Sequence, residues 1–166
     1  MANRQFGFTI AAVVFALDQL TKWIVAGPLE LQSVRQIVLL PIFNLSWTEN
    51  NGISLGLLNA ETEIGRWMLV AVTGAIAIGV AVWLGREKQR GDQLALGMVL
   101  GGALGNILDR IRFGYVVDFA DLHFGAFRPF LVFNVADAAI SIGVVILLLR
   151  AFLIKDERPK ENIEHA

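Results

Sequence analysis

The stretch FNVADAAISIGVVILLLRAFLI, which runs from Phe133 to Ile154, decides the fold of this chain. It is almost wholly apolar, and about 20 apolar residues in a helix are enough to cross the hydrocarbon core of a membrane. One end nevertheless carries Asp137, with Asn134 one helical turn before it. Charged side chains in membrane helices are costly and usually face a bundle interior or a wet cavity. The stretch therefore predicts a membrane helix with a functional group near one end.

Outward from this stretch, the chain contains three further apolar segments. Hydrophobic residues make up 55% of the 166 residues, and the mean hydropathy of +0.60 is high for a soluble protein. Helices satisfy their own backbone hydrogen bonds in lipid, and the length suits one domain. We therefore predict an all-α membrane protein, a four-helix transmembrane bundle in a single integral membrane domain. The expected spans are about 6–26, 67–84, 94–108 and 131–154, within the domain 1–166.

The segment Arg35–Asn59, RQIVLLPIFNLSWTENNGISLGLLN, is too apolar for a solvated loop. Its apolar runs are interrupted at Pro41 and at the turn-forming pair Asn51-Gly52, a pattern typical of short strands. Trp47 suits a position at the membrane interface. We therefore expect a small outward-facing β-rich segment that lies on the membrane surface. An irregular loop with one buried apolar side is the alternative.

The distribution of lysine and arginine predicts the orientation, because cytoplasmic loops are enriched in these residues. With four spans, both termini lie on one side. That side would carry eight cations, namely Arg4, Arg86, Lys88, Arg90, Arg150, Lys155, Arg158 and Lys160. The other side would carry five, namely Arg35, Arg66, Arg110, Arg112 and Arg128. We therefore expect the termini and the tail 155–166 in the cytoplasm, and the segments 27–66 and 109–130 outside. The first span is expected to be retained, since the charges of Asp18 and Lys22 are unlike a cleaved signal peptide.

Composition excludes several classes of site. The chain has no cysteine, which removes disulfides, thiolate catalysis and cysteine metal ligands. It has only two histidines, so neither a Ser–His–Asp set nor a zinc site is expected. The net charge of −1 gives no reason to expect nucleic acid as a partner. We therefore expect no metal and no cofactor, and aspartates are the plausible catalysts if the protein is a hydrolase.

Two polar groups lie within the spans. Asp18 and Lys22 are four residues apart, acid first, and can form an ion pair on one helix. This pair could hold the first helix in the bundle, form a wall of a polar site, or do both. In the third span, Asn106, Asp109 and Arg110 share a face at the outer end, as a charge cluster or as an organised hydrogen-bond platform. The same helix carries Gly97, Gly101 and Gly105, a small-residue repeat that permits close helix packing.

Asp118 and Asp137 are the candidates for paired carboxylates. Asp118 follows the third span, and Asp137 lies about six residues into the fourth, or roughly 9 Å below its outer end at 1.5 Å per residue. Asp121 is a competitor for the outer position, but its flanking residues suggest greater exposure. Two carboxylates in a poorly solvated site share a proton, so that one can activate water while the other acts as an acid. The residues alone are equally compatible with an ion or proton pathway through a transporter.

The chain resembles the lipoprotein signal peptidases (signal peptidase II), aspartic endopeptidases of the bacterial inner membrane. The resemblance rests on five motifs in the family's order: DQLTK (18–22), NNG (50–52), GGALGNILDR (101–110), VVDF (116–119) and FNVADAAI (133–140). It implies that Asp118 and Asp137 are the catalytic pair. It also implies that the supporting or substrate-binding residues are Asp18, Lys22, Asn50, Gly52, Asn106, Asp109, Arg110 and Asn134.

The resemblance also implies the substrate and the setting. The substrate would be a prolipoprotein whose junction cysteine already carries diacylglycerol, cleaved just before that cysteine. Such a substrate keeps its acyl chains in membrane lipid and its scissile bond near the outer boundary. We therefore expect an inner-membrane enzyme whose active site lies near the periplasmic face.

Overall fold

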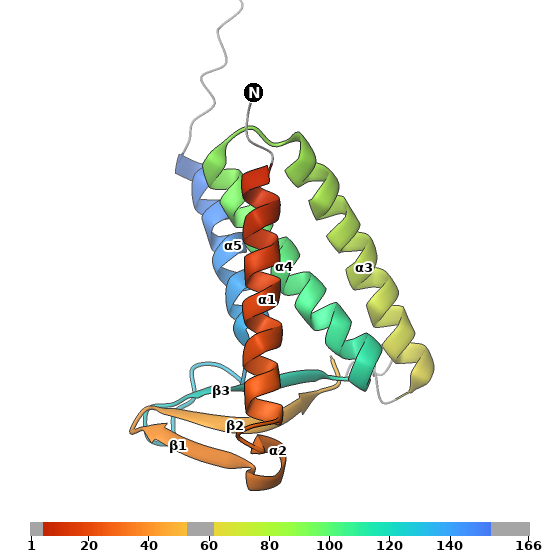
Figure 1. Cartoon of the computed structure of the whole chain (residues 1–166). Helices are drawn as coiled ribbons and strands as arrows, with labels where there is room; N and C mark the ends of the chain where they lie inside the picture. The colour runs from red at the N-terminus through yellow and green to blue at the C-terminus, as the bar shows by residue number, and fades with distance from the viewer. Residues whose placement is uncertain (1–4, 53–61, 154–166) are drawn as a thin grey trace, which may run out of the picture.

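The computed structural model describes residues 5–52 and 62–153, and its framework is a bundle of long helices (Figure 1). Four helices in the described part are long and apolar enough to cross a membrane: α1 (Gln5–Ala26), α3 (Glu63–Arg86), α4 (Arg90–Phe113) and α5 (Val135–Leu153). They confirm the expected number of spans, although α5 begins at Val135 and not at residue 131. Both α3 and α4 are longer than expected, so the first residues of the predicted outer segment 109–130 still belong to α4. The tail 155–166 lies outside the described residues.

Local capping explains these longer helices. The side chain of Thr62 accepts a hydrogen bond from the N–H of Gly65 at 3.1 Å and so starts α3 before its apolar run. Helix α4 ends at Phe113 and is capped by Gly114, whose φ of 91° is the left-handed conformation typical of a glycine after a helix. The guanidinium of Arg66 donates to the carbonyl oxygens of Arg110, at 2.7 Å, and of the next residue. These bonds satisfy the last carbonyls of α4 and tie its end to α3.

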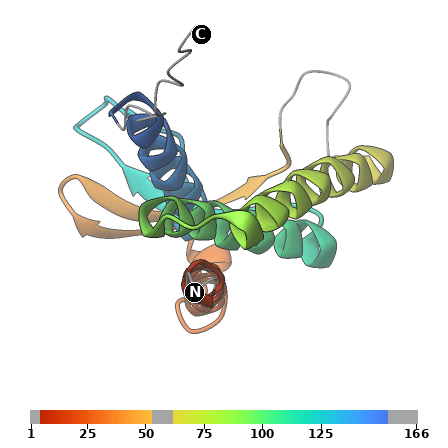
Figure 2. The same cartoon turned by 90° about the horizontal axis from the view of Figure 1, so that it is seen from above.

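Helix α4 is the central element of the bundle. It packs against α1, α3 and α5, which Figure 2 shows arranged around it. The predicted glycine repeat makes the contact with α1. A Cβ on Gly97 would meet the carbonyl oxygen of Gly7, and a Cβ on Gly101 would meet that of Ala11. The expectation of close helix packing at these glycines is therefore confirmed. The same face continues to Gly105, which lies against the carboxylate of Asp18.

A three-stranded antiparallel sheet lies at one end of the bundle (Figure 1). Its order is β1 (Gln36–Leu40), β2 (Phe43–Asn50) and β3 (Val116–Leu122), and the short helix α2 (Leu31–Val34) precedes it. The strands β1 and β2 confirm the expectation of short strands in Arg35–Asn59, of which residues 53–59 lie outside the described part. Strand β3 was not expected, and it pairs with β2 so that Asp118 lies opposite Thr48. The sheet therefore brings segments from both outer regions together.

The sheet is attached to the bundle through a small apolar core. Trp47 is buried in it together with Val25, Leu31 and Phe119. This burial shows that Trp47 packs against the end of α1 in the core, and its expected position at the membrane interface stays a prediction. The core fixes the sheet at the end of the bundle where α5 begins.

Candidate active site

Helix α5 starts at a reciprocal cap that involves one of the two candidate catalytic residues. The Oδ1 atom of Asn134 accepts the backbone N–H of Asp137 at 2.9 Å, and Asp137 Oδ2 accepts the N–H of Asn134 at 3.4 Å. This pattern of a capping box begins the helix at Val135. Asp137 therefore lies in the first turn, closer to the outer end than the six residues expected from the sequence.

Asp118 lies in β3 and is held on both carboxylate oxygens. The amide of Asn134 donates to its Oδ1 at 2.6 Å, and the amide of Asn50 donates to its Oδ2 at 3.0 Å. Its exposed fraction is 1%. Asn134 therefore contacts Asp118 with its amide N–H and Asp137 with its amide oxygen, and it joins the two acids. We call Asp118 and Asp137 the paired aspartates.

The paired aspartates interact electrostatically. Burial raises the pKa of Asp118 to about 7, and the negative charge of Asp137 contributes in the same direction. Hydrogen bonds from Asn50 and Asn134 oppose this rise without cancelling it. An acid with this pKa carries a proton in a large fraction of molecules at neutral pH. The pair can therefore present one proton donor and one proton acceptor to the same substrate.

Beneath the pair lies a buried ion cluster formed by Lys22, Asp18 and Asp109. The ammonium of Lys22 contacts Asp18 Oδ2 at 2.9 Å and Asp109 Oδ2 at 2.7 Å, and it donates to Asn106 Oδ1 at 3.2 Å. All three charged side chains are at most 5% exposed. The predicted pairing of Asp18 with Lys22 is confirmed. Lys22 also pairs with Asp109 on α4, so the cluster joins α1 to α4.

The ion cluster fixes the backbone on either side of the paired aspartates. Asp18 Oδ1 accepts the N–H of Ala136 at 3.0 Å, and Asp109 Oδ2 accepts the N–H of Val117 at 3.1 Å. Each of these residues directly precedes one of the paired aspartates. Two buried carboxylates therefore position the backbone beside the paired aspartates, with Lys22 between them.

Asn106 links the ion cluster to the pair. Its Nδ2 donates to Asp137 Oδ1 at 2.8 Å, while its Oδ1 accepts from Asn134 and from Lys22, each at 3.2 Å. This network confirms the hydrogen-bond platform expected on α4. One member was missed: the amide of Gln19 donates to both Asp18 and Asp109 at 3.1 Å. Its only sequence signal is its place beside Asp18.

Asn50 and Gly52 act together at the end of β2. Asn50 Oδ1 accepts the N–H of Gly52 at 2.9 Å, which turns its amide nitrogen toward Asp118. Gly52 has a φ of 91°, a conformation that favours glycine. Both of these sequence-predicted residues therefore lie at the site, with Gly52 orienting Asn50.

Arg110 is the least constrained of the predicted residues. Its Nη1 donates to the carbonyl of Asn106 at 3.4 Å, and its Nε is buried without a hydrogen-bond partner in the described structure. Asp109 is paired with Lys22 instead, so the two neighbours do not form the simple charge cluster considered from the sequence. Arg110 lies within electrostatic range of both paired aspartates. Its guanidinium therefore has unused donors close to them.

Asp121 does not join this site. It was expected to be exposed, but it is buried, with an ion pair to Arg128 at 3.0 Å and a hydrogen bond from Ser46 at 3.2 Å. The hydrogen bond from Arg128 lowers the pKa of Asp121. Asp118 and Asp121 are three residues apart on β3, which places them on opposite faces. The sequence did not predict that the loop after β3 folds back so that Arg128 pairs with Asp121. Asp121 was therefore expected to be exposed.

A groove beside the pair has room for a substrate. Its volume is about 720 Å³, and Asn50 and Asp137 form its polar side. Phe130, Leu131 and Ile142 line its apolar side and are themselves exposed. Within residues 5–52 and 62–153, no group of three or more His, Cys, Asp or Glu side chains is placed to hold a metal ion. The groove can accept an extended chain that carries apolar groups.

Comparisons with known proteins give a consistent result. A family model described as signal peptidase (SPase) II matches residues 10–153. The lipoprotein signal peptidase of Sphingopyxis alaskensis is 59% identical over 153 residues, covering 92% of this chain and 88% of that protein. That of Rhizorhabdus wittichii is 53% identical over 163 residues, covering 98% and 95%. Two solved structures titled as bacterial membrane enzymes have TM-scores of 0.73 and 0.74 at 29% and 30% identity. They cover 96% and 90% of this chain, and 94% and 93% of their own.

Proposed function

Because this chain belongs to the signal peptidase II family of aspartic proteases, we propose that Asp118 and Asp137 are its catalytic residues. The substrate in this proposal is a prolipoprotein with a diacylglyceryl-modified cysteine, cleaved just before that cysteine. The observation that carries the proposal is the shared hydrogen bonding through Asn134, together with the pKa of about 7 for Asp118. The transporter considered from the sequence is not supported by the family.

The proposed mechanism gives each acid a role. Asp118, whose pKa is raised to about 7, serves as the acid, and Asp137 serves as the base that takes a proton from a water whose oxygen attacks the scissile carbonyl carbon. Asp118 gives its proton to the carbonyl oxygen, which forms a tetrahedral diol. When the C–N bond breaks, the proton on Asp137 passes to the leaving nitrogen of the lipidated cysteine, and a diol proton returns to Asp118. The products are the signal-peptide carboxylic acid and a free cysteine amine, and the pair returns to its starting state.

Arg110 and the groove provide substrate contacts. A guanidinium presents five N–H donors in a planar fork, and the buried Nε of Arg110 has no partner among the described residues. We assign it to an oxygen of the substrate backbone or of the ester groups on the lipidated cysteine. The exposed apolar side chains of Phe130 and Leu131 would accompany the acyl chains from membrane lipid to the pair.

The proposed setting is the bacterial inner membrane, with the site near the periplasmic face and both termini cytoplasmic. Arg86, Arg90 and Arg150 lie at the end of the bundle opposite the sheet (Figure 1), as expected for a cytoplasmic end. The sheet and the first turn of α5 lie at the other end. Since one apolar core joins the sheet to α1, we also propose that the chain is a single integral membrane domain.

The decisive test is cleavage by the purified protein. A prolipoprotein carrying diacylglycerol on its junction cysteine is incubated with the protein in detergent, and the released signal peptide is identified by mass. The same precursor without the lipid serves as the control. We expect the lipidated precursor to be cleaved at the bond before the cysteine, and the precursor without lipid to remain uncleaved. No release, or release at another bond, contradicts the proposed function.

A further inference from the structure

A second cavity opens on the same end of the bundle but shares no lining residue with the active-site groove. Its volume is about 380 Å³. Its walls come from α1, α2, β2 and the end of α4, and they include Trp23, Gln32, Trp47, Arg112 and Tyr115. Its floor is formed in part by Lys22 and Asp109, the two members of the ion cluster that are 2.7 Å apart. The cavity therefore approaches the ion cluster from a side that the proposed reaction does not use.

The mouth of this cavity lies where two of the spans end. Helix α1 ends at Ala26 and helix α4 ends at Phe113, and both residues line the cavity. Trp23 is 63% exposed and Phe113 is 47% exposed on the surface of the bundle. Large aromatic side chains at the ends of spans are typical of the membrane interface. A lipid can therefore reach the cavity from the surrounding membrane.

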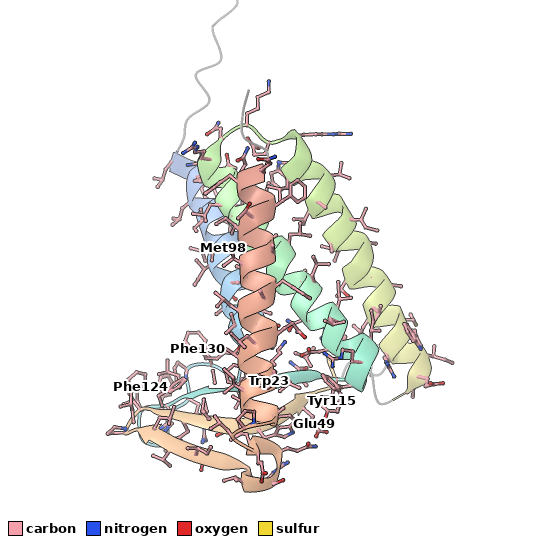
Figure 3. All side chains as sticks on the ribbon, in the orientation of Figure 1. Trp23, Glu49, Met98, Tyr115, Phe124 and Phe130 are labelled. Carbon is pink, nitrogen blue, oxygen red and sulfur yellow. The ribbon has the colours of Figure 1, made fainter. Side chains whose placement is uncertain are left out.

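Opposite charges flank the cavity. Arg112 is exposed and stacks over the ring of Phe113 at 5.1 Å, and it forms no ion pair within the described residues. On the sheet side, the carboxylate of Glu49 accepts from Trp47 Nε1 at 3.1 Å and from Gln32 Nε2 at 3.5 Å. Figure 3 shows Trp23, Tyr115 and Glu49 gathered where the bundle meets the sheet. Glu49 does not itself line the cavity, but Trp47 and Gln32, which donate to its carboxylate, both do.

We propose that this cavity binds the headgroup of a zwitterionic phospholipid. The phosphate contacts the guanidinium of Arg112, the ammonium group contacts the carboxylate of Glu49, and the acyl chains lie along Trp23 and Phe113. Charge complementarity selects this occupant: an anionic headgroup without an amine leaves Glu49 facing like charge, and a cation without a phosphate leaves Arg112 unpaired. The bound lipid lies against the ion cluster that positions β3.

The experiment measures lipid retention by native mass spectrometry. The purified full-length protein in detergent is titrated with phosphatidylethanolamine or with phosphatidylglycerol of the same acyl composition. Glu49→Gln and Arg112→Gln are compared with two matched controls, Glu63→Gln at the start of α3 and Arg86→Gln at its far end. Thermal unfolding of each variant establishes that it is folded.

The unmodified protein is expected to retain phosphatidylethanolamine at least about fivefold more than phosphatidylglycerol, as expected for one additional charge-assisted contact. Glu49→Gln removes this preference, Arg112→Gln lowers the retention of both lipids, and the controls behave as the unmodified protein. Equal retention of the two lipids by the unmodified protein overturns the proposal, whatever the variants do. A preference that survives Glu49→Gln also overturns it. Both results are measured as lipid retention, so they can be read whether or not the protein cleaves a prolipoprotein.

Discussion

Replacing Lys22 with methionine tests the ion cluster beneath the paired aspartates. An ammonium group has three donors, and in this structure they meet Asp18, Asp109 and Asn106 at 2.9, 2.7 and 3.2 Å. Lys22→Met leaves the two carboxylates buried without their cation. Removing one partner of a buried ion pair typically costs about 3–5 kcal/mol, and we place this variant in that range because Gln19 still donates to both carboxylates.

The loss should also appear in catalysis. Asp18 and Asp109 hold the N–H groups that precede the paired aspartates, so a shift of either carboxylate moves a reacting group. A misplacement of about 1 Å can lower the rate by two orders of magnitude. We expect cleavage to fall by at least tenfold, on the order of 1.4 kcal/mol in the barrier.

The assay combines thermal unfolding in detergent with the cleavage reaction over a range of pH. Lys88→Met, which removes an exposed lysine between α3 and α4, is the matched control. Adding Asp18→Asn to Lys22→Met should recover part of the stability by removing one stranded charge. An unfolding midpoint and a cleavage rate like those of the control would refute a positioning role for the cluster.

Three other predictions concern the catalytic groups. Asp118→Asn and Asp137→Asn should each abolish cleavage while unfolding stays near that of the unmodified protein, whereas Asp121→Asn should keep activity; substantial turnover by either of the first two would remove that residue from the pair. Arg110→Lys keeps the charge but loses the planar fork, so we expect cleavage to fall about tenfold with unchanged thermal stability; full activity would leave only a charge role. Because the pKa of Asp118 is raised from 3.8 to about 7, the folded protein binds more protons than the unfolded chain between these values. Its stability should therefore decrease as pH rises through this window, and cleavage should decline above about pH 7 as the acid ionises; a stability profile for Asp118→Asn with the same slope would contradict this assignment.

Hydropathy was sufficient to predict the four spans, because the requirement for about 20 apolar residues leaves little freedom. The strands were harder to predict from the sequence. Strand β1 and strand β2 are separated by a turn at Pro41 and were expected, but VVDFADL has buried residues on both faces and lacks the alternation that identifies a strand. The sequence also could not show that Asn134 ends the preceding loop and caps α5, which placed Asp137 too deep. Contacts such as that between Gln19 and Asp109 join residues 90 apart and depend on helix packing.

The hydrogen bond from Ala136 to Asp18 has a consequence for the order in which the helices insert into the membrane. It joins positions 118 residues apart, so the first span supplies a group that the last span requires. A chain emerging into the membrane with α1, α3 and α4 in place has its ion cluster and Asp118, but not Asp137 or the cap that orients it. If Asp118 and Asp137 are the catalytic pair, as proposed, hydrolysis requires that α5 has already inserted and packed against α1 and α4.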